Sequence, residues 1–139
     1  MITKTLLMSV AAFLSFGNIA FAGDLDLCSS EFFQGAYASA FRYCEKACSL
    51  NEGLGCGLLG AFYNDGLGVE RDFRQAKTYF EKACSLNDGT GFAVLGVLYD
   101  TGFGVKQNKK VSKEYYGKAC DLGIQEGCDK YRELNEQGY

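Results

Sequence analysis

The chain has 139 residues with 47% hydrophobic and 14% aromatic side chains, which suffices for one compact domain or a short array of repeats. Its formal net charge is −3, and it has no basic stripe to hold phosphates, so nucleic acid is not expected as a partner. The absence of histidine removes the commonest acid–base catalyst at neutral pH and the commonest zinc ligand. Seven cysteines in so short a chain indicate a disulfide scaffold, provided that the protein leaves the cytosol.

The N-terminus has the pattern of a secretory signal peptide. It combines a positive start at Lys4, an apolar stretch over 6–16 and a small-x-small cleavage site that ends at Ala22. The expected signal peptide is 1–22 and the expected mature chain is 23–139. An uncleaved membrane anchor is the disfavoured alternative, because the apolar stretch is too short to span a bilayer. We therefore expect a secreted or periplasmic protein.

A repeat of 36 residues occupies most of the mature chain. The segments 52–87 and 88–123 align without a gap and are identical at 14 of 36 positions. Partial copies flank them at 26–51 and 124–139, as capping pieces of an array do. A period of this length predicts stacked structural units, each made of a few secondary-structure elements.

Each full unit contains two stretches whose apolar residues have helical spacing. In the first stretch, Cys56, Leu59 and Tyr63 recur at offsets of three and four residues, and Gly66 then favours a helix end. Because a lone helix pair cannot bury its apolar stripe, we expect the pairs to stack into an all-α solenoid of helical hairpins. The expected helices are 26–33, 37–50, 53–64, 72–86, 89–100, 108–122 and 125–136.

Two glycines lie in the middle of expected helices. Gly60 and Gly96 occupy equivalent positions of the two full units. Since glycine in a helix interior costs about 1 kcal/mol relative to alanine, a compensating reason is needed. We expect a neighbouring helix to approach so closely that a Cβ atom would clash.

These motifs resemble the Sel-1-like repeat, a family of helical-hairpin solenoids related to tetratricopeptide repeats. The resemblance is carried by Leu-Gly-x-x-Tyr-x-x-Gly-x-Gly-Val at 59–69 and 95–105, and by Tyr-x-x-x-Ala at 79–83 and 115–119. The chain further resembles the secreted, disulfide-bridged branch, the Helicobacter cysteine-rich protein family, through Lys-Ala-Cys-x-Leu at 82–86 and 118–122 and Gly-x-x-x-Gly-Cys at 123–128. Phe92 departs from the pattern of that branch, which has a cysteine at this position.

The spacing of the cysteines predicts two disulfides at helix–helix corners. Cys48 and Cys56 are eight residues apart, and so are Cys120 and Cys128, with each midpoint in a loop between antiparallel helices. Residues at equal distances from such a loop face each other at the separation that a disulfide needs. Each bridge is expected to contribute roughly 2–3 kcal/mol to stability. A zinc site made of Cys44, Cys48 and Cys56 is the disfavoured alternative, since Cys-x-x-Cys is missing, and no cofactor is expected.

The third expected bridge joins Cys28 to Cys44, whose midpoint falls next to Gly35. By the corner rule Cys84 would pair with position 92, but that residue is Phe92. We therefore expect Cys84 to be a buried free thiol packed against the phenylalanine. A redox role for this thiol is disfavoured, because nothing nearby in the sequence is set to lower its pKa strongly.

Known catalytic motifs are missing from the sequence. Without histidine there is no Ser-His or Cys-His dyad, and no phosphate-binding loop occurs. Paired-carboxylate catalysis is disfavoured, because most of the carboxylates are expected to be solvated. The resemblance points the other way, since members of the cysteine-rich branch are described as β-lactamases or penicillin-binding proteins. The chain lacks the Ser-x-x-Lys, Ser-Asp-Asn and Lys-Thr-Gly motifs of serine β-lactamases, so weak β-lactam hydrolysis is an alternative carried by the resemblance alone.

The main prediction is a ligand-binding scaffold, because the first helices of each pair line the concave face of such solenoids. The residues expected to face a ligand are Leu58, Ala61, Asn64, Asp65, Val94, Val97, Asp100 and Thr101, with Lys130 and Glu133 as an extension on the last helix. Apolar side chains flanked by Asn and Asp suit an extended peptide. Packing of Leu58 and Val97 on neighbouring helices is an equally weighted alternative. We expect a monomer whose partner is a protein or a peptide, a peptidoglycan-derived one being a candidate.

Overall fold

The computed structural model describes residues 23–139, and the predicted signal peptide at 1–22 lies outside the described residues. Within this described part the chain forms helices joined by loops, and it contains no strand. The helices are α2 (Asp24–Phe33), α3 (Tyr37–Ser49), α4 (Gly53–Asp65), α5 (Phe73–Ser85), α6 (Gly89–Thr101), α7 (Lys109–Asp121) and α8 (Gln125–Glu136). Each coincides with an expected stretch, and its ends differ from the expected ones by two residues at most.

Local sequence explains where the helices begin and end. The Asp72 side chain accepts hydrogen bonds from the backbone N–H groups of Arg74 and Gln75, which caps the start of α5. Gly66 and Gly102 end α4 and α6 in the left-handed conformation, with φ of 66° and 79°. Glycine adopts this conformation without a steric penalty, so the tight loop follows directly from the repeat motif.

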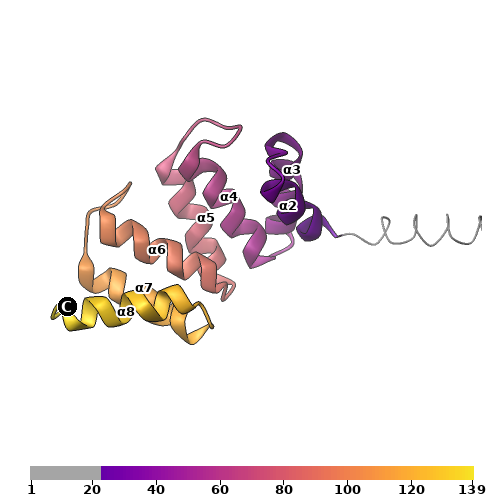
Figure 1. Cartoon of the computed structure of the whole chain (residues 1–139). Helices are drawn as coiled ribbons and strands as arrows, with labels where there is room; N and C mark the ends of the chain where they lie inside the picture. The colour runs from indigo at the N-terminus through magenta and orange to yellow at the C-terminus, as the bar shows by residue number, and fades with distance from the viewer. Residues whose placement is uncertain (1–22) are drawn as a thin grey trace, which may run out of the picture.

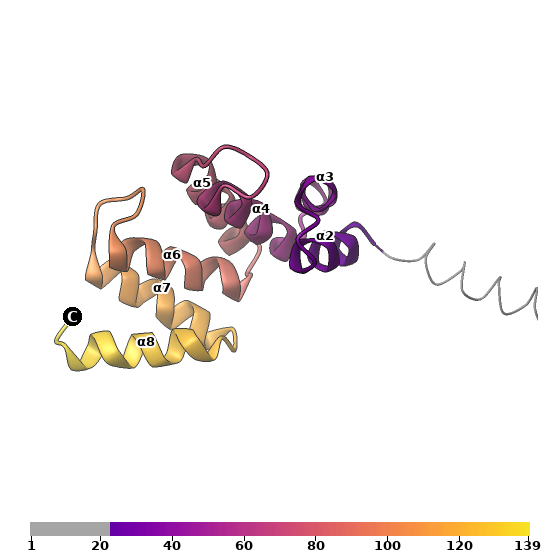
Figure 2. The same ribbon diagram turned by 45° about the horizontal axis from the view of Figure 1, so that its top comes forward.

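The helices stack as hairpins in chain order, from α2 and α3 at one end of the array to α8 at the other (Figure 1). We call α2, α4, α6 and α8 the A helices, and α3, α5 and α7 the B helices. Successive A helices contact one another, whereas successive B helices make no comparable contact in the described chain (Figure 2). Because neighbours crowd together on the inner side of a curved array, the A helices line the concave face.

The expected close approach at the mid-helix glycines is present. A Cβ atom on Gly60 would lie 2.5 Å from Cε1 of Phe80, and one on Gly96 would lie 2.7 Å from Cδ1 of Tyr116. Both rings are buried, with 2% or less of each residue exposed. The missing side chain thus lets the aromatic ring of a B helix lie against the backbone of the A helix in the same hairpin.

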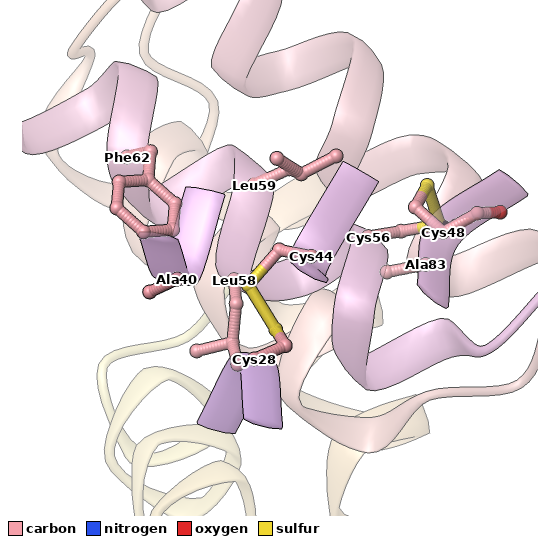
Figure 3. Close-up of a cluster of buried hydrophobic side chains, with 9 residues drawn as sticks. All are labelled: Cys28, Ala40, Cys44, Cys48, Cys56, Leu58, Leu59, Phe62 and Ala83. Carbon is pink, nitrogen blue, oxygen red and sulfur yellow. Dashed lines mark hydrogen bonds between the residues drawn. A yellow bond between two sulfur atoms is a disulfide. The ribbon is translucent and has the colours of Figure 1, made fainter. Parts of the chain in front are cut away.

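Three disulfides are present, and they join the pairs expected from the spacing. They are Cys28–Cys44, Cys48–Cys56 and Cys120–Cys128, with Cα–Cα distances of 4.8, 4.6 and 4.5 Å. The first two lie in the N-terminal core cluster (Figure 3). Cys84 is the free, buried cysteine of the described chain.

Candidate ligand-binding face

The residues expected to face a ligand lie on α4 and α6, two A helices that contact each other. Asp65, Val97 and Thr101 are exposed, and Val97 has 39% of its surface accessible. The half-buried members of the set are Ala61, Asn64, Val94 and Asp100. We use the term concave face for these seven residues and for the surface of α8 that continues them.

Leu58 does not belong to this open surface. Only 9% of the residue is exposed, and its side chain lies in the core cluster that contains Cys28 and Cys44 (Figure 3). The side chain therefore packs on the neighbouring helix α2. Such packing was one of the two alternatives that the sequence left open for Leu58. Val97 differs from Leu58, since it remains partly open.

Polar groups on the concave face are largely held by local contacts. The Asp100 carboxylate accepts a hydrogen bond from Lys109 Nζ at 2.5 Å and forms an ion pair with it. Asn64 Nδ2 donates to Asp65 Oδ1 at 2.9 Å. Thr101 Oγ1 donates to the carbonyl of Val97 at 2.8 Å, so its hydroxyl is directed back to the helix. The apolar part of this surface is therefore bordered by oriented polar groups.

The concave face becomes acidic on α8. One repeat length, 36 residues, beyond the α6 surface positions lie Glu126, Asp129, Lys130 and Glu133. Lys130 Nζ lies 3.0 Å from Glu133 Oε2, and this hydrogen bond raises the pKa of Lys130, with smaller contributions from Asp100 and Glu126. The direct partner of Lys130 is therefore Glu133 on the same helix, and Asp100 and Glu126 act on it only more weakly.

Sequence reasoning placed Lys130 and Glu133 on this surface but missed Glu126 and Asp129. The signal that finds the missing pair is the repeat period, because Glu126 and Asp129 follow Thr90 and Ala93 by the same 36 residues. Both acidic side chains are exposed in the structure.

The other side of the array carries an open cavity of about 400 Å³ between α5 and α7, whose floor includes Cys84, Phe92 and Leu95. Lys118 Nζ lies 5.6 Å from the centroid of the Phe92 ring. In the preceding repeat the equivalent Lys82 donates instead to the carbonyl of Cys48 at 3.2 Å. The two equivalent lysines therefore have different partners, and Lys118 lies over the ring of the residue that replaces the corner cysteine.

The free thiol in this cavity is poorly suited to nucleophilic chemistry. Burial, with Asp88 as the next contributor, raises the pKa of Cys84 to about 12. A thiol with so high a pKa is protonated at neutral pH, and the thiolate is the reactive form. Over residues 23–139 no group of three or more Cys, Asp or Glu side chains is placed to hold a metal ion. Across the same residues no helix is long and apolar enough to cross a membrane.

Comparison with known families identifies the repeat. The Sel1 repeat matches the chain at residues 36–52, 54–88 and 93–124, which is more than half of its length. Among curated proteins, "Beta-lactamase HcpA" of Helicobacter pylori is 52% identical over 40 residues. That alignment covers 29% of this chain but only 16% of the relative, so the chain corresponds to a small part of that protein.

Solved structures resemble most of the array. The Helicobacter pylori cysteine rich protein B has a TM-score of 0.63 and 43% identity, and the alignment covers 66% of this chain and 69% of that one. A Sel1 repeat protein from Oxalobacter formigenes has a TM-score of 0.75 at 22% identity, with 80% and 46% covered. A protective antigen of uropathogenic Escherichia coli that displays an SLR fold has a TM-score of 0.67 at 21% identity, with 74% and 22% covered. The last two show the fold alone.

Proposed function

Because the chain belongs to the Sel1 repeat family, as a cysteine-rich member, we propose that it is a helical scaffold that binds a protein or peptide on its concave face. The observation that carries this proposal is the open surface on α4 and α6. Val97 is 39% exposed, although Leu95 and Leu98 beside it on α6 are buried in the core. An aliphatic side chain held open on a rigid helix suits contact with a ligand.

The chemistry of this surface favours an extended peptide. Ala61, Val94 and Val97 offer small apolar contacts, and Asp65 and Thr101 lie beside them with polar groups. Small side chains leave room for the backbone of a ligand, while the polar border can accept or donate hydrogen bonds. Disulfides tie α2 and α4 to α3, and α8 to α7, so the helices on either side of α6 lose little conformational freedom on binding.

Three disulfides also support an oxidising compartment as the place where the protein works. Together with the predicted signal peptide, they favour a secreted or periplasmic monomer. In such a compartment peptides derived from peptidoglycan are among the candidate ligands.

The local identity to a protein named as a beta-lactamase favours a second candidate function, β-lactam hydrolysis. Because the match covers a small part of that relative, the activity is a proposal for this chain and ranks below peptide binding.

Binding and hydrolysis are separable in one set of experiments on oxidised protein spanning 23–139. Peptides retained from a random-sequence display library are synthesised and titrated against the protein and against Val97→Lys, which replaces an aliphatic contact on the concave face by a positive charge. Leu50→Lys, at an exposed helix corner outside this face, is the matched control. We expect Val97→Lys to weaken binding at least ten-fold and Leu50→Lys to leave it unchanged. The reverse pattern would place the site elsewhere, and turnover of a chromogenic cephalosporin would favour the second function.

A further inference from the structure

Charge is divided between the two sets of helices. Within their bounds the four A helices carry nine Asp or Glu residues and two Lys or Arg residues. The three B helices show the opposite composition, with nine Lys or Arg residues and four Asp or Glu residues. The net charge of −3 conceals this division, which gives each side of the array its own sign.

The carboxylates of the concave face are accessible. The exposed carboxylates are Asp65, Glu126, Asp129 and Glu133. Asp65 borders the apolar patch of Ala61, Val94 and Val97 from α4, and the other three border it from α8. The patch itself carries no basic side chain, so an approaching ligand meets apolar atoms bordered by negative charge.

The cations available on the A helices neutralise only part of this charge. Lys130 pairs with Glu133, and Arg132 pairs with Asp129 at 3.4 Å, in both cases within α8. In the described chain Lys109 is the single B-helix cation that forms an ion pair with an A-helix carboxylate. Glu126 and Asp65 have no ion-pair partner among the described residues, so the concave face keeps a net negative charge.

We propose that the ligand of this face is a cationic extended peptide, with lysine or arginine side chains next to small aliphatic ones. The inference rests on the proposed function and specifies its partner. Complementary charge speeds association and selects the partner, and it disfavours anionic peptides through like-charge repulsion. The aliphatic side chains contact Val94 and Val97, while the basic ones lie near Glu126, Asp129 and Glu133.

A second copy of this chain is the competing occupant, since the basic B helices of one molecule complement the acidic A helices of another. Such a contact is not self-complementary and would continue into chains of molecules. It predicts assembly that rises with protein concentration at low salt, whereas a peptide ligand leaves the free protein monomeric.

The test uses three fluorescein-labelled peptides of equal length, in which valine alternates with lysine, serine or glutamate. Binding to the oxidised protein is measured by fluorescence anisotropy at two salt concentrations. We expect the lysine peptide to bind at least ten-fold more tightly than the glutamate peptide, with a difference that shrinks at high salt because exposed charges are screened. The glutamate peptide binding as tightly as the lysine peptide would overturn the proposal.

Two triple variants with the same change in net charge locate the effect. The first variant alters the concave face and carries Glu126→Gln/Asp129→Asn/Glu133→Gln. The control variant has one substitution on each B helix and carries Glu45→Gln/Glu81→Gln/Glu114→Gln. We expect the first variant to weaken lysine-peptide binding about ten-fold and the second to leave it unchanged. Equal weakening by both would overturn the proposal, because only net charge would then matter.

The remaining outcomes separate this inference from the proposed function. Binding of the lysine peptide that is lost in Val97→Lys but insensitive to the concave-face triple variant would overturn the cationic specificity and leave the peptide site in place. No binding of any of the three peptides would overturn both. Concentration-dependent assembly in light scattering that the concave-face triple variant abolishes would assign the face to a second copy.

Discussion

Cys44 occupies in α3 the position that Phe80 occupies in α5. Each residue lies one helical turn before a Cys at the helix end, Cys48 or Cys84. The ring of Phe80 lies against Gly60 on the preceding A helix, whereas Cys44 is bonded to Cys28 on its own preceding A helix. The first hairpin therefore uses a covalent bond at the contact where the others use an aromatic ring over a glycine.

This equivalence predicts that the packing solution can replace the covalent one. The free energy of unfolding of the variant Cys28→Gly/Cys44→Phe is expected to exceed that of Cys28→Ala/Cys44→Ala by about 1–2 kcal/mol, because the ring restores buried apolar area. Both variants are expected to be less stable than the parent, since each lacks the bridge. Guanidinium unfolding followed by circular dichroism measures the order of the three proteins. If the Gly/Phe variant is the least stable of them, the two hairpins do not share one packing scheme.

A second prediction concerns the glycine at the ring contact. Gly60→Ala is expected to lower the free energy of unfolding by about 1–2 kcal/mol, because the clash with the buried Phe80 ring outweighs the gain in helix propensity. Gly57→Ala is the matched control in the same helix, where a Cβ atom would lie 4.0 Å from Ala83 Cβ, an ordinary contact. That variant is expected to raise stability by up to about 1 kcal/mol. Thermal unfolding measures the stability of both variants. A Gly60→Ala variant more stable than the parent would mean that the Phe80 ring can move.

Helix positions and disulfides were predictable because they follow from local periods. The apolar spacing fixes α4 to α7, and cysteines equidistant from a corner, such as Cys48 and Cys56, face each other once the helices are antiparallel. The burial of Leu58 was not decided by sequence, because it depends on how α2 packs against α4. The acidic surface of α8 was predicted only in part. Glu126 and Asp129 share no residue type with the equivalent Thr90 and Ala93, so matching of residue types misses them and only the 36-residue period relates the two pairs.

A third prediction follows from the missing cysteine at position 92. The three B-to-A corners share one geometry: a Cβ atom on Gly55, Gly91 or Gly127 would lie 2.7–2.8 Å from the Cβ of an alanine in the preceding B helix. Phe92→Cys therefore places its sulfur opposite Cys84, and a fourth disulfide is expected to form. The added bridge is expected to raise stability by about 2 kcal/mol, since it closes a short loop.

Thiol counting tests this expectation directly. The parent protein has one thiol that reacts with an alkylating reagent after unfolding, and the Phe92→Cys variant is expected to have none. Phe92→Ser is the control for the loss of the aromatic ring, and it is expected to keep the single thiol. Two reactive thiols in Phe92→Cys would show that this corner differs from the other two.

The last prediction concerns alkaline pH. Burial, with Asp100 as the next contributor, raises the pKa of Tyr116 from 10.0 to about 12. The unfolded chain therefore loses this proton before the folded one does, and unfolding becomes easier as the pH rises. The stability that Tyr116 contributes is complete below pH 10 and falls as the pH rises through about 12. Denaturant unfolding between pH 8 and pH 11 is expected to show this decline. Tyr116→Phe is expected to make it less steep, and the remainder comes from Tyr79 and Tyr115, whose pKa values are also raised by burial.

The measurement is best made in a Cys84→Ala background, because a thiolate formed at high pH attacks disulfides. Tyr139→Phe is the matched control, because Tyr139 has 43% of its surface exposed. This substitution is expected to leave the pH dependence of the free energy of unfolding unchanged. An equal decline in the Tyr116→Phe protein would mean that ionisation of Tyr116 is not the cause.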